Sequence, residues 1–442
     1  MMWPVVGKSL STNGYNQKLL MGIDMSADLG TLYDDHVRHN PFSFFAKLQD
    51  QKPVYQLPGT DIFLVSSYQH IREIVKDVRT FSNEHPKGIT SFHNFSRTAD
   101  EILETQGFGR KVKTIANNDP PSHYLFRRLF STIITPRLIR ELENKIKRDV
   151  SDILDDIDTS RPFDIVHVLM TPIPLFVIAE IVGVDRSDYQ KFKRWASATL
   201  YQNKLAMTES DIIEDVSQIA ELQHYLVEVI RKRKAQPGGD AVSKFIATPV
   251  EGDKFLTEKE ILSILELLIG AGAETTTNSI ANALLYMIDN PDAEREIRQD
   301  PGKIDAFVEE MLRLESSVVG IWRFVTEDTV VGTQKIPKGS KILLSFLAAD
   351  QDPEVFENPR IFNMDRNNLQ QHIAFGSGIH TCPGNSLARM EMKAVFGELL
   401  RRYSTISLAV PRTEIEYLEF LTLRGPKALH VTVTPGGRLG AL

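Results

Sequence analysis

The 442-residue chain has the composition of an ordinary globular protein, with 42% hydrophobic and 25% charged residues. Its formal net charge of −7 gives no electrostatic case for nucleic-acid binding, which needs a basic surface. Its single cysteine excludes an internal disulfide, so the sequence gives no support to a secreted, disulfide-stabilised class.

No run of about 18 apolar residues occurs, and the stretch before Lys8 is too short for the apolar part of a signal peptide. We therefore expect a soluble cytoplasmic protein without a membrane anchor. Residues 1–30 are expected to be extended or poorly ordered. Length alone suggests two or three domains, but no repeat or change of composition divides the chain, so we expect one domain over residues 1–442.

The first elements expected along the chain are a hairpin and a helix. Residues 53–65 (PVYQLPGTDIFLV) carry apolar and β-branched runs on either side of a Pro-Gly-Thr turn, which predicts two antiparallel strands. Residues 67–81 are typical of a helix. Residues 85–118 mix Gly, Asn, His and Phe without firm periodicity, which predicts a loop with short helical pieces.

A second helix is expected to open at residues 119–123 (DPPSH), because proline is favourable in a first helical turn. His123 and Arg127 are four residues apart and therefore share one face of this helix. Taken alone, these two residues indicate no more than a solvated cationic stripe.

Further helices are predicted at residues 172–184, 186–201 and 212–234, and a much longer one follows. Thr257 and Glu260 fit a capping box, and Pro291 ends the apolar pattern. About 32 residues at ~1.5 Å each give a helix of about 48 Å, long enough to cross the whole molecule.

The middle of that helix reads AGAETTTNS, residues 271–279. Gly272 and three consecutive threonines are poor helix formers, and Glu274 is an acid in an otherwise apolar stretch. One interpretation is a local break in the helical hydrogen bonds, opened by hydroxyls or water. The other is a packing glycine beside hydroxyls that bond to preceding carbonyls.

Glu310 and Arg313 lie three residues apart on another predicted helix, a spacing that is common on surfaces and weak by itself. Strands are expected at residues 341–347, 421–422 and 429–433, with a Gly-Pro turn between the last two.

The stretch 375–389 (FGSGIHTCPGNSLAR) holds the only cysteine, Cys382, between a glycine-rich loop and a helix expected at residues 385–403. Helix N-termini favour anions, so we expect a lowered thiol pKa and a thiolate. One thiolate is too few ligands for structural zinc, whereas a haem iron needs only one proximal protein ligand. The residue-level alternative is a buried free cysteine beside a turn.

The whole string resembles the haem-binding loop of the cytochrome P-450 family. The family pattern Phe-x-x-Gly-x-His-x-Cys-x-Gly is filled by Phe375, Gly378, His380, Cys382 and Gly384. Three further matches occur in the family's order: DPPSHYLFRR, Ala-Gly-x-Glu-Thr and Glu-x-x-Arg. Residues 350–353 (DQDP) depart from the family's Asn-Arg-Asp-Pro, which is expected to weaken a local pairing without touching the chemistry.

The resemblance implies a mainly α fold with small β-sheets, with haem b between the long central helix and the cysteine loop. It implies Cys382 as the iron ligand and a set of other haem-binding residues: His123, Arg127, Arg323, His380, Ala271, Gly272, Phe375 and Gly376. Thr275 and Glu274 would serve oxygen activation, the hydroxyl with water giving protons and the carboxylate reloading them. Glu310, Arg313 and Arg366 would form a supporting triad. Candidate pocket walls are Val318, Val319, Ile321, Leu421 and Thr422.

The implied activity is monooxygenation: one atom of O₂ enters a hydrophobic small molecule such as a terpenoid, steroid, fatty acid or aromatic compound. Electrons would come from a separate ferredoxin-type protein, because the chain has no flavin or iron–sulfur motif. Arg128, Arg389 and Lys393 are candidates for its docking patch, or form a solvated charged face. The alternatives are a peroxide-using or non-oxygenating haem-thiolate enzyme, and a haem-binding sensor or carrier. The Glu274–Thr275 pair argues against both.

Overall fold

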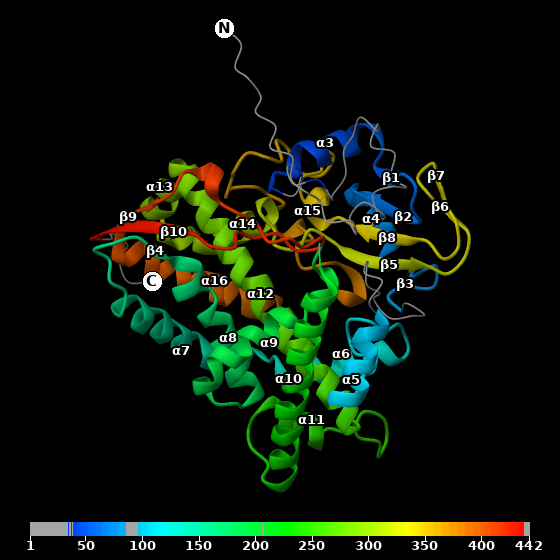
Figure 1. Ribbon diagram of the computed structural model, residues 1–442. Helices are drawn as coiled ribbons and strands as arrows, with labels where there is room; N and C mark the ends of the chain where they lie inside the picture. Colours follow the sequence, from blue (N-terminus) through cyan, green and yellow to red (C-terminus); the bar gives the residue numbers. More distant parts are fainter. Residues whose placement is uncertain (1–33, 35–36, 38, 85–95, 206, 437–442) are drawn as a thin grey trace.

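The computed structural model describes residues 34, 37, 39–84, 96–205 and 207–436 (Figure 1). The expectation for residues 1–30 lies outside this range. In the part of the chain so described, no helix combines the length and the hydropathy that a bilayer crossing needs.

The largest sheet lies at the right of Figure 1 and has the strand order β1-β2-β8-β5-β3. Its strands are β1 (Val54–Gln56), β2 (Ile62–Val65), β8 (Lys341–Leu344), β5 (Ile321–Val325) and β3 (Phe81–Ser82). The antiparallel pair of β1 and β2 confirms the hairpin predicted in residues 53–65. The strand predicted at residues 341–347 ends early, because Ser345 caps the short helix α15 (Phe346–Ala349).

Two smaller sheets complete the β structure of the described residues. One has the order β4-β10-β9, and the other pairs β6 with β7. Their strands are β4 (Phe163–Asp164), β10 (His430–Pro435), β9 (Tyr403–Leu408), β6 (Thr329–Val331) and β7 (Gln334–Ile336). The strand predicted at residues 421–422 is wrong: the two residues form no strand, although isolated bridges flank them, Phe420 with Lys204 and Leu423 with Val318.

Helices form most of the rest, which confirms the mainly α fold. They are α3 (Phe42–Gln51), α4 (Tyr68–Ile74), α5 (Ser96–Gln106), α6 (Ser122–Ile133), α7 (Pro136–Asp155), α8 (Pro172–Val182), α9 (Tyr189–Ala198), α10 (Glu209–Ala235), α11 (Ala241–Ala247), α12 (Glu258–Asp289), α13 (Pro291–Gln299), α14 (Ile304–Leu314) and α16 (Asn385–Arg402). Helix α4 is shorter than residues 67–81, because Phe81 pairs with β5. Helix α5 is longer than the short pieces expected in residues 85–118.

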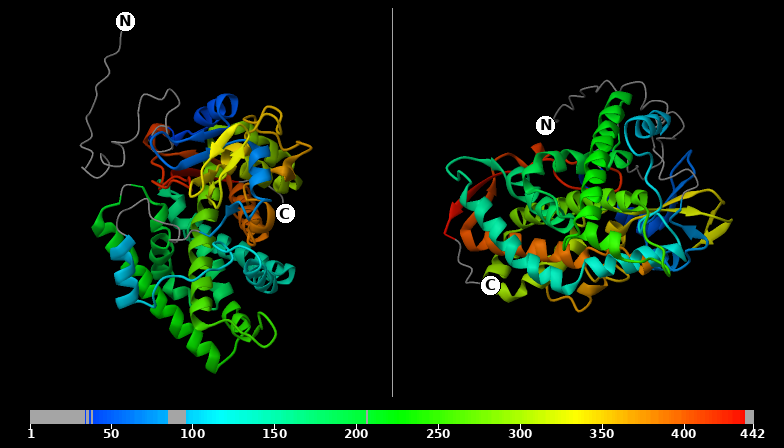
Figure 2. Two further views of the ribbon diagram at one scale, coloured as in Figure 1. Left: turned by 90° about the vertical axis from the view of Figure 1, so that its right-hand side faces the viewer. Right: turned by 90° about the horizontal axis from the view of Figure 1, so that it is seen from below.

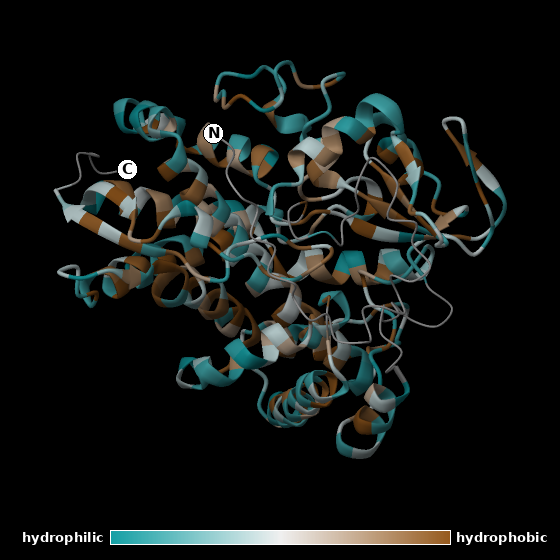
Figure 3. Cartoon of the chain, turned by 45° about the horizontal axis from the view of Figure 1, so that its top comes forward, coloured by the Kyte–Doolittle hydropathy of each residue, from teal (hydrophilic) through white to brown (hydrophobic). Residues whose placement is uncertain are grey.

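The organising element is α12, whose 32 residues match the predicted helix. Its first turn has the capping box of Thr257 and Glu260, and it ends before Pro291. Figures 1 and 2 show it running through the helical part, and it contacts α8, α9, α10, α14 and α16. Because it is surrounded, it buries side chains along most of its length. Figure 3 shows the same distribution, with hydrophobic residues toward the centre and hydrophilic ones on peripheral helices.

Candidate active site

A cavity of about 650 Å³ lies between α12 and the cysteine loop. Its wall includes Ala271, Gly272 and Thr275 of α12 and, from more than a hundred residues further along the chain, Phe375 and Cys382. The fold therefore brings together the two segments that the sequence predicts on opposite sides of one cofactor.

The cysteine loop owes its path to two glycines. Gly376 and Gly378 have φ values of 75° and 74°, a region that glycine adopts without steric cost. The turn they make lets the Cys382 amide donate to the Phe375 carbonyl at 2.8 Å. Helix α16 then begins at Asn385, whose side-chain amide donates to the Cys382 carbonyl at 2.6 Å. The thiol is thus fixed at the N-terminus of α16 and lines the cavity.

The expected low pKa of the thiol is wrong for the protein without a bound metal. Burial raises the pKa of Cys382, although the Gly384 amide, Arg127 and Arg389 all act in the opposite direction. The helix terminus was visible in the sequence, whereas the burial was not. A metal that binds the sulfur must therefore displace its proton, as metal binding to thiols generally does.

Four predicted haem-binding side chains gather beside this loop. His123 and Arg127 come from α6, Arg323 from β5, and His380 from the loop itself. The rings of His123 and His380 lie 4.2 Å apart, and Arg127 donates to the Thr381 carbonyl. Arg323 is 2% exposed and donates to the Trp322 carbonyl at 2.8 Å.

This His/Arg cluster (His123, Arg127, Arg323 and His380) combines two guanidinium cations with two imidazoles whose pKa values are lowered by burial. Both ring nitrogens of His123 and Nε2 of His380 are buried without hydrogen-bond partners. Burial lowers the pKa of Arg323 to about 10, and burial together with Arg323 and His123 lowers that of His380 to about 3. The hydrogen bonds described for Arg127 and Arg323 go to backbone carbonyls, and Asp119 is the acid whose charge acts on Arg323. Unpaired buried donors of this kind fit a carboxylate-bearing group such as a haem with its propionates.

Of the two interpretations of residues 271–279, the structure shows the packing glycine. Helix α12 is continuous through them. A Cβ on Gly272 would approach Ile178 of α8 to 2.5 Å, so the glycine allows the two helices to come close. The Thr275 hydroxyl donates to the Ala271 carbonyl at 2.7 Å. The hydroxyls of Ser279 and Ser317 both donate to the Thr275 carbonyl, at 2.9 and 2.8 Å.

Glu274 is placed differently from its neighbour Thr275. It does not line the cavity, and it is half-buried on another side of α12. Burial raises its pKa, while Lys193 and Lys204 act to lower it. The structure therefore puts the hydroxyl in the cavity and the carboxyl on the flank of the helix that faces α9.

The five candidate pocket residues divide into two groups. Val318, Ile321 and Thr422 line the cavity. Val319 and Leu421 instead pack in a hydrophobic core cluster with Leu343 and Leu347, and this corrects their assignment to the pocket wall. The reason is geometric: neighbouring residues of an extended segment point to opposite sides.

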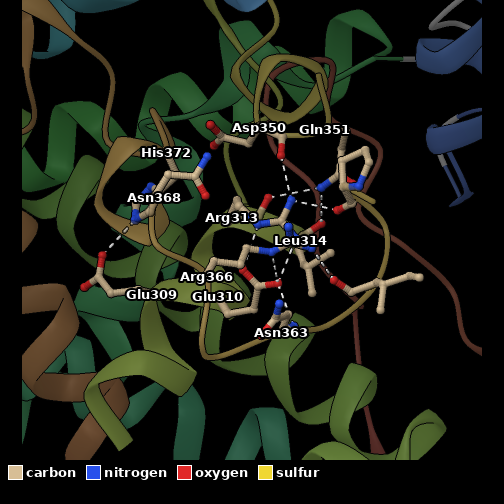
Figure 4. Close-up of polar contacts among 12 residues, drawn as sticks. Glu309, Glu310, Arg313, Leu314, Asp350, Gln351, Asn363, Arg366, Asn368 and His372 are labelled. Carbon is tan, nitrogen blue, oxygen red and sulfur yellow. Dashed lines mark hydrogen bonds and ion pairs between the residues drawn. The ribbon is translucent and has the colours of Figure 1, made fainter. Parts of the chain in front are cut away.

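The predicted supporting triad (Glu310, Arg313 and Arg366) is assembled and buried, as Figure 4 shows. Arg313 donates hydrogen bonds to both carboxylate oxygens of Glu310, at 2.7 and 2.8 Å, and Arg366 Nε donates to Glu310 Oε1 at 3.0 Å. The remaining guanidinium nitrogen of Arg313 donates to the carbonyls of Asp350 and Pro359. The triad thus joins α14 to the long segment that leads to the cysteine loop.

The departure at residues 350–353 does not leave this segment loose. Gln351 donates to the Arg313 and Leu314 carbonyls, both at 3.2 Å (Figure 4). Asp350 Oδ1 accepts from the Ile373 amide at 2.7 Å, which ties it to the chain just before the loop. Burial raises the pKa of Asp350 to about 7.

Two buried acids on the cavity wall were not predicted. Glu391 on α16 is 2% exposed, its Oε2 has no hydrogen-bond partner, and burial raises its pKa well above the ordinary value. Glu266 on α12 is 1% exposed. The only signal in the sequence is an acid among apolar helix positions, which also occurs on ordinary half-buried faces.

The proposed docking residues differ in their surroundings. Arg389 stacks on the Phe375 ring at 4.5 Å and pairs with Glu309, at 2.9 Å between NH2 and Oε2. Lys393 lies 2.8 Å from Asp305. Arg128 donates to the Val250 carbonyl. Two of the three cations are therefore already neutralised within the protein.

Comparison with known proteins finds similarity to the cytochrome P-450 family over nearly the whole chain. The family description Cytochrome P-450 matches residues 29–431. The chain is 33% identical over 357 residues to cytochrome P-450 CYP107DY1 of Priestia megaterium, covering 81% of this chain and 84% of that protein. It is 30% identical over 411 residues to the polyketide biosynthesis cytochrome P-450 PksS of Bacillus subtilis, covering 90% and 96%.

The fold agrees equally well with a solved structure, that of cytochrome P-450 CREJ in complex with (4-ethylphenyl) dihydrogen phosphate. The TM-score is 0.84 at 29% identity, with 90% of this chain and 98% of that chain covered. Members of this family use cysteine-ligated haem b, and the chain has one cysteine with which to hold it. The chain therefore belongs to the cytochrome P-450 family and is a haem-thiolate monooxygenase, which needs O₂ and a redox partner.

Proposed function

We propose that this single-domain enzyme hydroxylates a hydrophobic small molecule inside the cavity between Thr275 and Cys382. The observation that carries the proposal is that a thiol and a threonine hydroxyl from distant segments line one cavity, beside the His/Arg cluster, whose buried imidazole nitrogens lack hydrogen-bond partners. When bound there, haem supplies the activation of O₂ by reduction, and a thiolate ligand donates electron density that favours cleavage of the O–O bond.

Cys382 would be the iron ligand. Its amide is already bonded to Phe375, and Asn385 holds its carbonyl, so the sulfur needs no rearrangement of the loop to reach the metal. The His/Arg cluster would hold the two propionates, which supply the acceptors that His123 and His380 lack. Gly376 and Phe375 would complete the wall against the porphyrin.

Thr275 would position a water molecule that gives protons to the reacting oxygen. Its hydroxyl donates its proton to the Ala271 carbonyl, which fixes the orientation of the hydroxyl. The lone pairs of its oxygen remain free to accept a hydrogen bond from that water. Glu274 would return protons to this hydroxyl from the outer flank of α12. Burial raises the pKa of Glu274, so its carboxyl keeps a proton to pass on at a higher pH than an ordinary glutamate would.

The substrate class rests on the cavity walls. Around Thr275 they are apolar, with Ile178, Leu268, Val318 and Ile321, so they exclude water from the reacting atoms and accept hydrocarbon surface. The relatives do not narrow the substrate class further, because one is named for polyketide biosynthesis and the structure of another was solved with a small aryl phosphate.

A ferredoxin-type protein would deliver the electrons. Among the candidate docking residues, Arg128 is the one whose described contacts are to a backbone carbonyl rather than to an acid, so it keeps its charge for an acidic partner. Arg389 and Lys393 would contribute mainly by holding the loop and α16 in place.

The experiment that tests this proposal is isotopic. A library of hydrophobic compounds is first screened for ligands that change the haem spectrum. A compound that does so is then turned over under ¹⁸O₂ with a reductase and a ferredoxin. We expect the product to carry one labelled oxygen atom, with the other in water. Product oxygen derived from unlabelled water, or equally fast turnover with peroxide and no reductant, would contradict monooxygenation.

A further inference from the structure

Arg389 of α16 contacts both residues that hold the backbone of Cys382. Its guanidinium stacks on the Phe375 ring at 4.5 Å, and the Phe375 carbonyl accepts from the Cys382 amide at 2.8 Å. Its Nη1 donates to Asn385 Oδ1 at 3.0 Å, and the Asn385 side-chain amide donates to the Cys382 carbonyl at 2.6 Å. The fold therefore fixes one positive charge beside the cysteine loop.

Glu309 of α14 binds this cation with a carboxylate. Nε and Nη2 of Arg389 donate to its two oxygens, the second at 2.9 Å. Nε2 of His372 lies 2.8 Å from Glu309 Oε2 (Figure 4), and Nδ1 of His372 accepts from the Ala374 amide at 3.3 Å, so Nε2 is the nitrogen that donates. The Glu309 side chain is 8% exposed. Although burial acts to raise it, the hydrogen bonds from His372 and Arg389 lower the pKa of Glu309 to about 2, so the carboxylate stays charged.

The charge of Arg389 acts on the sulfur. Burial raises the pKa of the Cys382 thiol, and Arg389 and Arg127 are the two side chains whose charges oppose that rise. The two cations differ in what balances them. Arg127 belongs to the His/Arg cluster, where haem propionates would take up its charge, whereas Glu309 balances Arg389 from within the protein. A cation beside a thiolate draws electron density from the metal that the sulfur binds, and a carboxylate on the cation offsets this effect.

We propose that Glu309 and Arg389 form a charge pair that sets the electron density on the Cys382 sulfur, and thereby the potential at which the haem iron accepts one electron from the redox partner. This inference rests on the proposed function, because it needs the sulfur as the iron ligand. Glu309 and Arg389 act through the cysteine loop, so they are positioning residues rather than catalytic ones.

Spectroelectrochemical titration of the purified holoenzyme tests this through the midpoint potential of the haem. Glu309→Gln keeps the shape of the side chain and leaves Arg389 without its counter-charge, so the reduced state should gain about fivefold over the oxidised state. This is a rise of about 40 mV, since a tenfold change is about 59 mV for one electron. Arg389→Gln removes the cation and leaves the carboxylate, so the potential should fall by a similar amount.

The infrared C–O stretch of the reduced, carbon-monoxide-bound protein gives a second readout. A more electron-rich iron weakens the C–O bond, so the stretching frequency should rise in Glu309→Gln and fall in Arg389→Gln. Opposite shifts in the two variants are a signature of charge, because structural damage to the loop would move both variants in the same direction.

Asp305→Asn is the matched control. Asp305 pairs with Lys393 at 2.8 Å between the same two helices, and each residue lies four positions from its counterpart in the Glu309–Arg389 pair. The substitution removes the same charge, but the Asp305 side chain is 75% exposed and neither residue of this pair lines the cavity. Because solvent screens an exposed charge, the reduction equilibrium should stay within about twofold of the wild type.

Shifts of the same sign in Glu309→Gln and Arg389→Gln would overturn the inference, as would shifts below about twofold in both variants or an equal shift in Asp305→Asn. Because Glu309 is buried, Glu309→Gln could fail to take up haem. The partly exposed Arg389 then decides the question, since an unchanged or raised potential in Arg389→Gln is a contradiction by itself.

The reduced, carbon-monoxide-treated spectrum of the same preparations separates this failure from a wider one. A thiolate-type spectrum in the wild type with unshifted potentials in the variants rejects only the charge pair. The absence of that spectrum in the wild type rejects the proposed function.

Discussion

Replacing Thr275 with alanine is expected to uncouple electron consumption from product formation. The variant should still consume reductant at a rate close to that of the wild type, but the yield of product per electron pair should fall by about tenfold or more, with hydrogen peroxide in its place. The reason is that the hydroxyl anchored on Ala271 is removed from the cavity wall while the rest of α12 is unchanged. The measurement is the ratio of product to oxidised NADH, together with a peroxide assay.

Thr277→Ala is the control for that experiment. It is the same substitution two residues further along α12, at a buried hydroxyl that donates to the Met170 carbonyl at 3.1 Å and does not line the cavity. It should cost some stability and leave coupling intact. Unchanged product yield in Thr275→Ala, or equal uncoupling in both variants, would remove Thr275 from the proton supply.

The second large effect is expected from Arg313→Ala, which should lower the free energy of unfolding by about 3–5 kcal/mol, the usual result of breaking a buried ion pair from one side. Glu310 would keep Arg366 but lose its bidentate partner, and the carbonyls of Asp350 and Pro359 would lose their donor. Urea denaturation followed by far-UV circular dichroism measures the change.

Arg401→Ala is the matched comparison. Arg401 pairs with Glu398 at the same three-residue spacing, but its side chain is 43% exposed, and surface pairs are worth about 0.2–1 kcal/mol. Because both ion pairs have the same three-residue spacing, the difference between the two losses in unfolding free energy reports the effect of burial. A loss below 1 kcal/mol in Arg313→Ala would show that the triad does not support the segment before the cysteine loop.

Much of this site could be predicted because its chemistry needs particular residues at short spacing. Cys382 with its glycines, the hydroxyl of Thr275 and the triad were all predicted, and the structure brings each to the cavity or to its support. The bounds of α12 were predictable for a local reason as well. A capping box and a proline act within one helical turn, so the helix ends that they set can be predicted without knowledge of the tertiary fold.

The errors share one cause, which is that burial and direction depend on distant parts of the chain. The thiol pKa was predicted from the helix terminus alone, and desolvation by the surrounding fold reversed its direction. Similarly, Val319 and Leu421 are as apolar as Val318, and only their packing against Leu343 and Leu347 shows that they face the core rather than the cavity.

The pair of Glu266 and Lys111 on the cavity wall had no signal in the sequence. Glu266 and Lys111 come from segments about 150 residues apart, and a lone acid or lysine on a helix or loop is ordinarily exposed. Only the three-dimensional fold brings the two side chains together, with Lys111 Nζ 3.5 Å from Glu266 Oε2.

The central claim is that Cys382 becomes the anionic ligand of a haem iron. The most direct test is the visible spectrum of the purified protein after reduction and treatment with carbon monoxide, compared with that of Cys382→Ser. We predict the strongly red-shifted Soret band of thiolate coordination in the wild type and its loss in the variant. A wild-type protein that takes up haem but lacks that band, or a serine variant that keeps it, would contradict the account.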